Sequence, residues 1–167
     1  MQIAVMSDSH DHIWNLCKAL EQIRRTDVQM IIHCGDFVAP FMLKELDAAG
    51  IPVHGVFGNN DGDQHLLTKL ALTELGNITL HGVVGAVDAE GFKIGFTHLP
   101  QVGEGLAYSG RYQLVCYGHT HKYYQKKIGS TIFLNPGEIM GKDGQAGFCI
   151  VDTGAETVHR INVKREM

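Results

Sequence analysis

The stretch Ile3-Ala4-Val5-Met6-Ser7-Asp8-Ser9-His10 decides how the rest of the chain is read. Its first four residues are apolar, and an apolar run of this length, followed by a polar loop, is typical of a buried strand. Ser7 begins the loop at the carboxyl end of that strand. Asp8 and His10 are two residues apart in the loop, so a carboxylate and an imidazole can be directed at one point.

The same arrangement recurs four more times. In each case an apolar run ends, and side chains that carry oxygen or imidazole nitrogen follow it. These further loops contain Gly35-Asp36, Gly58-Asn59-Asn60-Asp61, Thr97-His98 and Gly118-His119-Thr120-His121. Open α/β sheets place their sites at the carboxyl ends of strands. The five loops are therefore predicted to share one crevice.

The first half of the chain alternates strand and helix patterns. Apolar residues repeat at helical spacing over 13–23, with Asp11 as the predicted N-cap. Two further helices are predicted over 40–49, opened by proline, and over 63–75. This βαβαβα pattern indicates parallel strands joined by right-handed crossovers.

The second half changes to short strands joined by tight turns, with a short helix predicted over 103–110. The pattern indicates a mixed α/β domain in which two sheets pack together. The predicted strands are 78–81, 83–87, 92–97, 114–117, 123–128, 131–134, 148–151 and 158–163.

Composition limits the classes of function. The 167 residues carry a net charge of −4 and no long basic run, so nucleic acid is disfavoured as a partner. No apolar run approaches the ~20 residues of a membrane span, and the N-terminus enters a strand without a targeting pattern. We expect a soluble cytoplasmic protein. Its four dispersed cysteines are expected to be reduced packing residues.

The clustered side chains offer oxygen and imidazole ligands and no thiolate. Seven such donors exceed one tetrahedral site and suit two divalent first-row ions that share a carboxylate. Taken alone, each loop is also compatible with ordinary turn polarity. The paired histidines after the strand 114–117 are the most specific signal, because such pairs seldom serve packing. The candidate ligands are Asp8, His10, Asp36, Asn59, His98, His119 and His121.

The five loops, in this order, resemble the calcineurin-like metallophosphoesterases, and in particular their small single-domain bacterial and archaeal phosphodiesterases. Asn135-Pro136-Gly137 also fits that subfamily. The resemblance implies an α/β fold in which two mixed β-sheets pack as a sandwich flanked by helices, in four α/β/β/α layers. It spans nearly the whole chain, so we expect a single domain over residues 1–167.

The resemblance also implies roles for the seven ligands and a reaction. A hydroxide that bridges two divalent ions would attack the phosphorus of a small phosphodiester. Manganese is the implied ion, with nickel, zinc, iron and cobalt as alternatives. By resemblance Asp8, His10 and His121 bind one ion, Asn59, His98 and His119 bind the other, Asp36 bridges both, and Asp36, Asn59 and His119 are catalytic.

Two positions depart from the family pattern. Many relatives have a histidine where this chain has Asn60, and an amide cannot act as a general acid. We therefore expect a preference for diesters with good leaving groups. Asn60 and His12 are the candidate substrate-binding residues, with a plain loop histidine as the alternative for His12. Leu99-Pro100 stands where relatives usually have glycine, which is expected to alter the loop after His98.

Three alternatives remain at this stage. The chain could be a phosphomonoesterase or nucleotide hydrolase, a nuclease, or a non-catalytic scaffold like the retromer subunit that shares this fold. The complete set of seven ligands favours an enzyme over the scaffold. The sequence leaves homo-oligomer formation open. His33 is predicted to be a satisfied core histidine. Glu138 is predicted to be a turn carboxylate, with a place in the wall of the crevice as the alternative.

Overall fold

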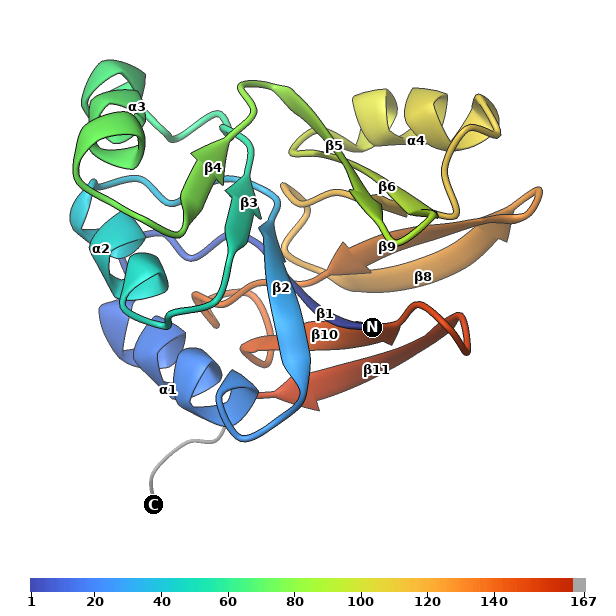
Figure 1. Ribbon diagram of the computed structural model, residues 1–167, viewed down its shortest axis with the longest axis horizontal. Helices are drawn as coiled ribbons and strands as arrows, with labels where there is room; N and C mark the ends of the chain where they lie inside the picture. Colours follow the sequence, from blue (N-terminus) through green and yellow to red (C-terminus); the bar gives the residue numbers. More distant parts are fainter. Residues whose placement is uncertain (164–167) are drawn as a thin grey trace.

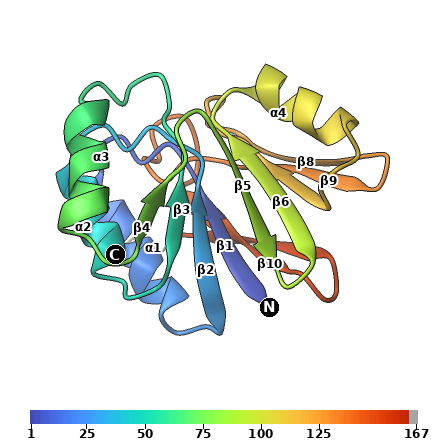
Figure 2. The ribbon, with the colours of Figure 1, turned by 45° about the horizontal axis from the view of Figure 1, so that its top comes forward.

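The computed structural model describes residues 1–163, in which two β-sheets pack face to face with helices on their outer faces (Figure 1). The turned view shows the helices of the first half of the chain beside the first sheet and the helix of the second half above the second sheet (Figure 2). The predicted α/β/β/α layers are therefore confirmed. The predicted domain extends over residues 1–167, and its last four residues lie outside the described part. None of the helices within 1–163 has the length and apolarity that a membrane crossing requires.

The first half of the chain alternates strand and helix as predicted. The strands β1 to β4 lie side by side in the first sheet and run parallel to one another. Its elements are β1 (Gln2–Met6), α1 (Ile13–Ile23), β2 (Val28–His33), α2 (Phe41–Asp47), β3 (Val53–Gly55), α3 (Gln64–Thr73) and β4 (Ile78–Leu80).

The second half builds the other sheet and completes the first. Its elements are β5 (Val84–Ala89), β6 (Phe92–Thr97), α4 (Pro100–Tyr108), β7 (Leu114–Cys116), β8 (Tyr123–Ile128), β9 (Thr131–Pro136), β10 (Gly147–Asp152) and β11 (Thr157–Asn162). The sheet orders are β11-β10-β1-β2-β3-β4 and β5-β6-β7-β9-β8. The return of β10 antiparallel to β1 makes the first sheet mixed and places β1 at its centre.

Strand β1 is apolar at every core position because it is buried on both faces. Ala4 and Met6 belong to the core cluster that also contains residues of α1, α2 and α3, while Ile3 and Val5 belong to the cluster shared with the second sheet. All four side chains are fully buried. A strand between two apolar layers needs apolar residues in succession rather than in alternation. This explains the run that opens the chain.

Two predicted helix starts are wrong, one because of a tertiary contact and the other because of a local preference of proline. His12 is the N-cap of α1, since its Nδ1 accepts the Asn15 N–H at 3.3 Å. Asp11 instead accepts the Ala39 N–H at 2.7 Å and so joins two neighbouring loops. Helix α4 begins at Pro100, earlier than predicted, because proline is favoured in the first helical turn.

Candidate active site

The five predicted loops meet at the carboxyl ends of β1, β2, β3, β6 and β7. Backbone hydrogen bonds join neighbouring loops, for example from the Asp8 N–H to the Gly35 carbonyl at 3.1 Å. Another runs from the Gly118 N–H to the His98 carbonyl at 3.0 Å and links the loops after β6 and β7. The loops therefore form one connected rim, as expected from the parallel strand order.

Glycine allows the loops to approach the ligands closely. A Cβ at Gly58 would overlap the Asp36 carboxylate, and a Cβ at Gly118 would overlap the Ser7 hydroxyl. Only glycine leaves room for the backbone at such positions. This accounts for the glycine that precedes Asn59 and His119 in the sequence.

The backbone of the site is strained. Seven of the nine non-glycine residues with positive φ in the range 1–163 lie in three of these loops. Each such conformation costs about 1–3 kcal/mol and persists only where the surrounding structure determines it. The strain therefore marks the loops that direct the candidate ligands. The seven residues are Asp8, His10, Asp11, Asp36, Val38, His119 and His121.

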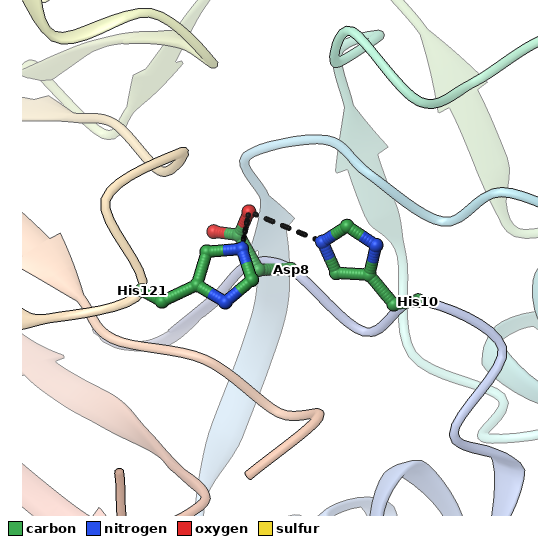
Figure 3. A group of neighbouring side chains, drawn as sticks. All are labelled: Asp8, His10 and His121. Atoms are coloured by element: carbon green, nitrogen blue, oxygen red, sulfur yellow. Dashed lines mark ion pairs between the residues drawn. The ribbon is translucent and has the colours of Figure 1, made fainter. Parts of the chain in front are cut away.

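Asp8, His10 and His121 form one half of the site (Figure 3). Asp8 Oδ1 lies 3.7 Å from His10 Nε2 and 3.4 Å from His121 Nε2. Asp8 is fully buried, and its Oδ2 accepts the His119 N–H at 3.0 Å. Two imidazole nitrogens and a carboxylate oxygen thus converge on one point, as predicted.

Asn59, His98 and His119 form the other half. Asn59 Oδ1 lies 3.0 Å from His98 Nε2 and 2.8 Å from His119 Nδ1. The other ring nitrogen of His98 lies 2.8 Å from the Cys34 carbonyl oxygen. Because a carbonyl only accepts, Nδ1 of His98 donates there, which leaves Nε2 as the ring nitrogen that faces Asn59 and the site.

Asp36 lies between the two halves. Its Oδ2 is 3.3 Å from His10 Nε2 and 3.4 Å from His98 Nε2. Asn60 donates to both Asp36 oxygens, from its N–H to Oδ1 and from its side-chain amide to Oδ2, each at 2.8 Å. Burial raises the pKa of Asp36, but His98 and then Asn60 outweigh it, so that the pKa lies well below its usual value. Asp36 is therefore a stable carboxylate.

The donor set fits divalent cations. Nε2 of His10 is buried and has no hydrogen-bond partner, although two carboxylates surround it. The Asp8 carboxylate raises the pKa of His10 despite burial, and Asp36 adds to this effect. The site thus attracts positive charge, and carboxylate and imidazole groups are ligands for first-row divalent ions. An unpartnered buried nitrogen is what a metal ligand presents before it binds.

Comparison with known proteins supports this assignment. A family model described as the calcineurin-like phosphoesterase superfamily domain matches residues 1–156. The chain belongs to the calcineurin-like phosphoesterase superfamily. It is accordingly a hydrolase of phosphoric ester bonds, and its family implies divalent metal ions. The family predicted from the five loops is confirmed.

Individual relatives agree with the family. Phosphodiesterase MJ0936 from Methanocaldococcus jannaschii is 37% identical over 143 residues, which cover 84% of this chain and 86% of that protein. The solved structure of an archaeal phosphodiesterase has a TM-score of 0.88 at 33% identity, over 97% of this chain and 99% of that one. Vps29 from Chaetomium thermophilum has a TM-score of 0.71 at 14% identity, over 99% and 98% of the two chains, which is a likeness of fold alone.

The departure at Leu99-Pro100 leaves His98 of this phosphoesterase in the site. Leu99 has extended backbone as the N-cap residue of α4, and Pro100 occupies the first turn. His98 retains its contacts to the Cys34 carbonyl and to Asn59 on either side of the ring. Leu99 and Pro100 are therefore compatible with both ring contacts of His98.

Asp61 is a functional residue that the sequence analysis missed. Its buried carboxylate accepts the N–H groups of Asp36, at 2.9 Å, and of Val38 and Gly58, each at 2.7 Å. It therefore fixes the loop of Asp36 against the loop of Asn59. An aspartate within Asn-Asn-Asp-Gly is typical of a turn, so the sequence around Asp61 did not indicate that its carboxylate joins two loops.

Glu138 combines the predicted role of a turn carboxylate with the alternative role beside the candidate ligands. Glu138 is buried, and its Oε2 lies 2.9 Å from Nδ1 of His121. Its Oε1 accepts the N–H groups of Asp143, at 2.6 Å, and of Gly144, at 2.8 Å. A carboxylate on the far nitrogen of a ligating histidine fixes its ring and tautomer. Glu138 is thus a positioning residue for His121.

Glu138→Gln is expected to weaken metal binding by about 10–100-fold, because an amide nitrogen facing Nδ1 would oppose one donor with another. Isothermal titration with Mn²⁺ measures the effect. Glu74→Gln makes the same change at an exposed position directly after α3 and should bind like the wild type. Equal affinity in Glu138→Gln would show that the contact with His121 has no positioning role.

His33 is a satisfied core histidine, as predicted. Its Nδ1 accepts the Gly35 N–H at 3.2 Å, which leaves the proton on Nε2, 3.1 Å from the Ser9 hydroxyl. The ring also stacks on Phe37 with 4.1 Å between centroids. Burial lowers the pKa of His33 to about 3. A proton on Nδ1 would face the Gly35 N–H, so the folded protein keeps this ring neutral.

His33 should make stability dependent on pH. Its pKa is lower in the folded chain than the usual 6.5, so its contribution is complete above pH 6.5 and falls as the pH falls toward 3. Between pH 6.5 and about pH 5 the metal-stripped wild type should lose about 2 kcal/mol more unfolding free energy than His33→Gln. Urea denaturation at both pH values measures this. Parallel losses in the two proteins would contradict it.

Proposed function

We propose that this phosphoesterase is a phosphodiesterase that hydrolyses small phosphodiesters with two divalent cations, of which manganese is the expected one. The observation that carries the proposal is the position of Asp36 between two groups of ligands, 3.3 Å from His10 Nε2 and 3.4 Å from His98 Nε2. A carboxylate shared in this way suits a pair of neighbouring ions. The relative from Methanocaldococcus jannaschii is itself named a phosphodiesterase.

The proposed ligand groups follow the two halves of the site. When bound, the ions supply an acidified water and neutralise charge on the phosphoryl oxygens. The protein holds the ligands in place through the Cys34 carbonyl, Asp61 and Glu138. The proposed ligands are Asp8, His10 and His121 for one ion, Asn59, His98 and His119 for the other, and Asp36 for both.

The environment of Asn60 supports diesters with good leaving groups. Its amide donates to Asp36 Oδ2 and has no acidic proton to give to a leaving oxygen. His12 uses Nδ1 to cap α1, which leaves only Nε2 for the substrate contact predicted from the sequence. A leaving group that departs without protonation removes the need for an acid at either position.

The rates of two p-nitrophenyl substrates test the proposal. With Mn²⁺, kcat/KM for bis(p-nitrophenyl) phosphate is expected to exceed that for p-nitrophenyl phosphate by about tenfold or more. A faster monoester would favour the phosphomonoesterase alternative. The experiment is repeated with nickel, zinc, iron and cobalt in place of manganese. If the protein binds these ions but hydrolyses neither substrate with any of them, the proposal is overturned and the scaffold alternative is favoured.

A further inference from the structure

A mostly apolar pocket adjoins the second half of the site. Its volume is about 180 Å³, and its wall includes two of the candidate ligands, Asn59 and His98. The remaining wall comes from Phe57, Val83 and Leu99, with Gln64 as its polar contribution. The pocket is therefore continuous with the place where the phosphate group would bind, and a substituent on phosphorus can enter it.

Three segments build this pocket from both sheets. Phe57 follows β3, Val83 lies in the connection from β4 to β5, and Leu99 joins β6 to α4 (Figure 1). The Phe57 N–H donates to the Gly82 carbonyl at 2.7 Å. The Thr97 hydroxyl donates to the Val83 carbonyl at 2.9 Å. These bonds join the segments, so the pocket is formed before any ligand binds.

Two of the exposed residues of the pocket, Val83 and Leu99, are apolar although they border a highly polar site. Val83 is 60% exposed and Leu99 is 37% exposed. Covering such surface with an apolar group is favourable by about 25 cal/mol per Å². Binding pockets commonly combine apolar walls with a few polar groups that set orientation, and Gln64 provides one here.

The size of the pocket limits its occupant. Pockets for drug-sized ligands have volumes of about 300–1,000 Å³. A volume of about 180 Å³ instead suits a single ring or a short apolar group. Leu99, the residue before α4, supplies part of the apolar wall next to the candidate ligand His98.

We propose that this pocket binds an aromatic ester group of the substrate, so that the enzyme prefers aryl over small alkyl phosphodiesters. The inference rests on the function proposed above, because the ring is placed by its bond to the phosphoryl group. The pocket adds apolar contacts for the ring beside Asn59 and His98. Leu99 and Val83 are the specificity-determining residues.

Binding of two phosphonates tests the proposal apart from turnover. Isothermal titration with Mn²⁺-loaded protein should give about tenfold tighter binding of phenylphosphonate than of methylphosphonate. Leu99→Ala should remove most of this preference and leave the affinity for methylphosphonate unchanged. The Leu99 side chain makes no capping hydrogen bond, so its truncation spares the start of α4. Leu72→Ala, at a 79% exposed leucine outside the pocket, is the matched control.

Val83→Thr is the second variant, because it keeps the shape of the side chain and replaces one methyl group by a hydroxyl. It should also lower the preference for the phenyl compound. The proposal that the pocket binds an aromatic group would be overturned if the wild type bound both phosphonates equally. It would also be overturned if both variants kept the wild-type preference for phenylphosphonate. If the wild type hydrolyses bis(p-nitrophenyl) phosphate in that case, the proposed function stands. If it neither hydrolyses the diester nor binds either phosphonate, both proposals fail.

Discussion

Replacing Asp36 by asparagine is expected to lower kcat for diester hydrolysis by about 10³-fold or more, while the fold survives. Asp36 Oδ2 is the oxygen that faces both His10 Nε2 and His98 Nε2, and an amide there carries no negative charge. The Asn60 N–H at Oδ1 would still find a carbonyl oxygen to accept it. Hydrolysis of bis(p-nitrophenyl) phosphate, circular dichroism and elemental analysis together measure activity, fold and metal content.

A matched control separates this effect from a general loss of negative charge. Asp27→Asn makes the same change at an exposed position between α1 and β2 and should keep wild-type turnover. Metal-dependent hydrolysis at the wild-type rate in Asp36→Asn would contradict the bridging role. A variant that has lost its circular dichroism spectrum would instead show that the Asp36 carboxylate is needed for folding.

The fold was largely predictable because its central strand is surrounded by apolar layers. A strand such as β1, buried on both faces, shows as an unbroken apolar run, and the parallel order of β1 to β4 follows from the alternation with helices. The N-cap of α1 was not predictable. Asp11 is the better local candidate, but its carboxylate is engaged by the Ala39 N–H from another loop. Such a contact depends on the tertiary structure.

The candidate ligands were predictable for the same reason, since parallel strands bring their carboxyl ends to one edge. The residues behind them were not. Asp61 and Glu138 look like turn residues in the sequence, and only the folded chain brings Glu138 to His121 and Asp61 to the Asp36 N–H. The apolar pocket at Leu99 was also hidden, because its walls come from three separate segments. Local sequence thus reveals the candidate metal ligands and not the residues that hold those ligands in place.

Removal of metal is expected to reduce diester hydrolysis to the background rate, and addition of Mn²⁺ should restore it. Two groups of candidate ligands share Asp36, so titration of the metal-stripped wild type should give two equivalents of bound Mn²⁺ per chain. His10→Ala should weaken one equivalent by about 100-fold, and Asn59→Ala should weaken the other. His65→Ala, at an exposed histidine of α3, should leave both equivalents intact.

Metal binding should raise the free energy of unfolding, because the ligands are brought together only in the folded chain. Metal at 100 times its dissociation constant adds about 2.7 kcal/mol per site to the unfolding free energy. Bound ions would also offset the mutual repulsion of the Asp8 and Asp36 carboxylates, which are buried in one group with His98. Thermal unfolding with and without Mn²⁺ measures the gain, which should be smaller in Asn59→Ala than in the wild type. A single equivalent in the wild type, or an unchanged melting temperature with metal, would be evidence against the binuclear site.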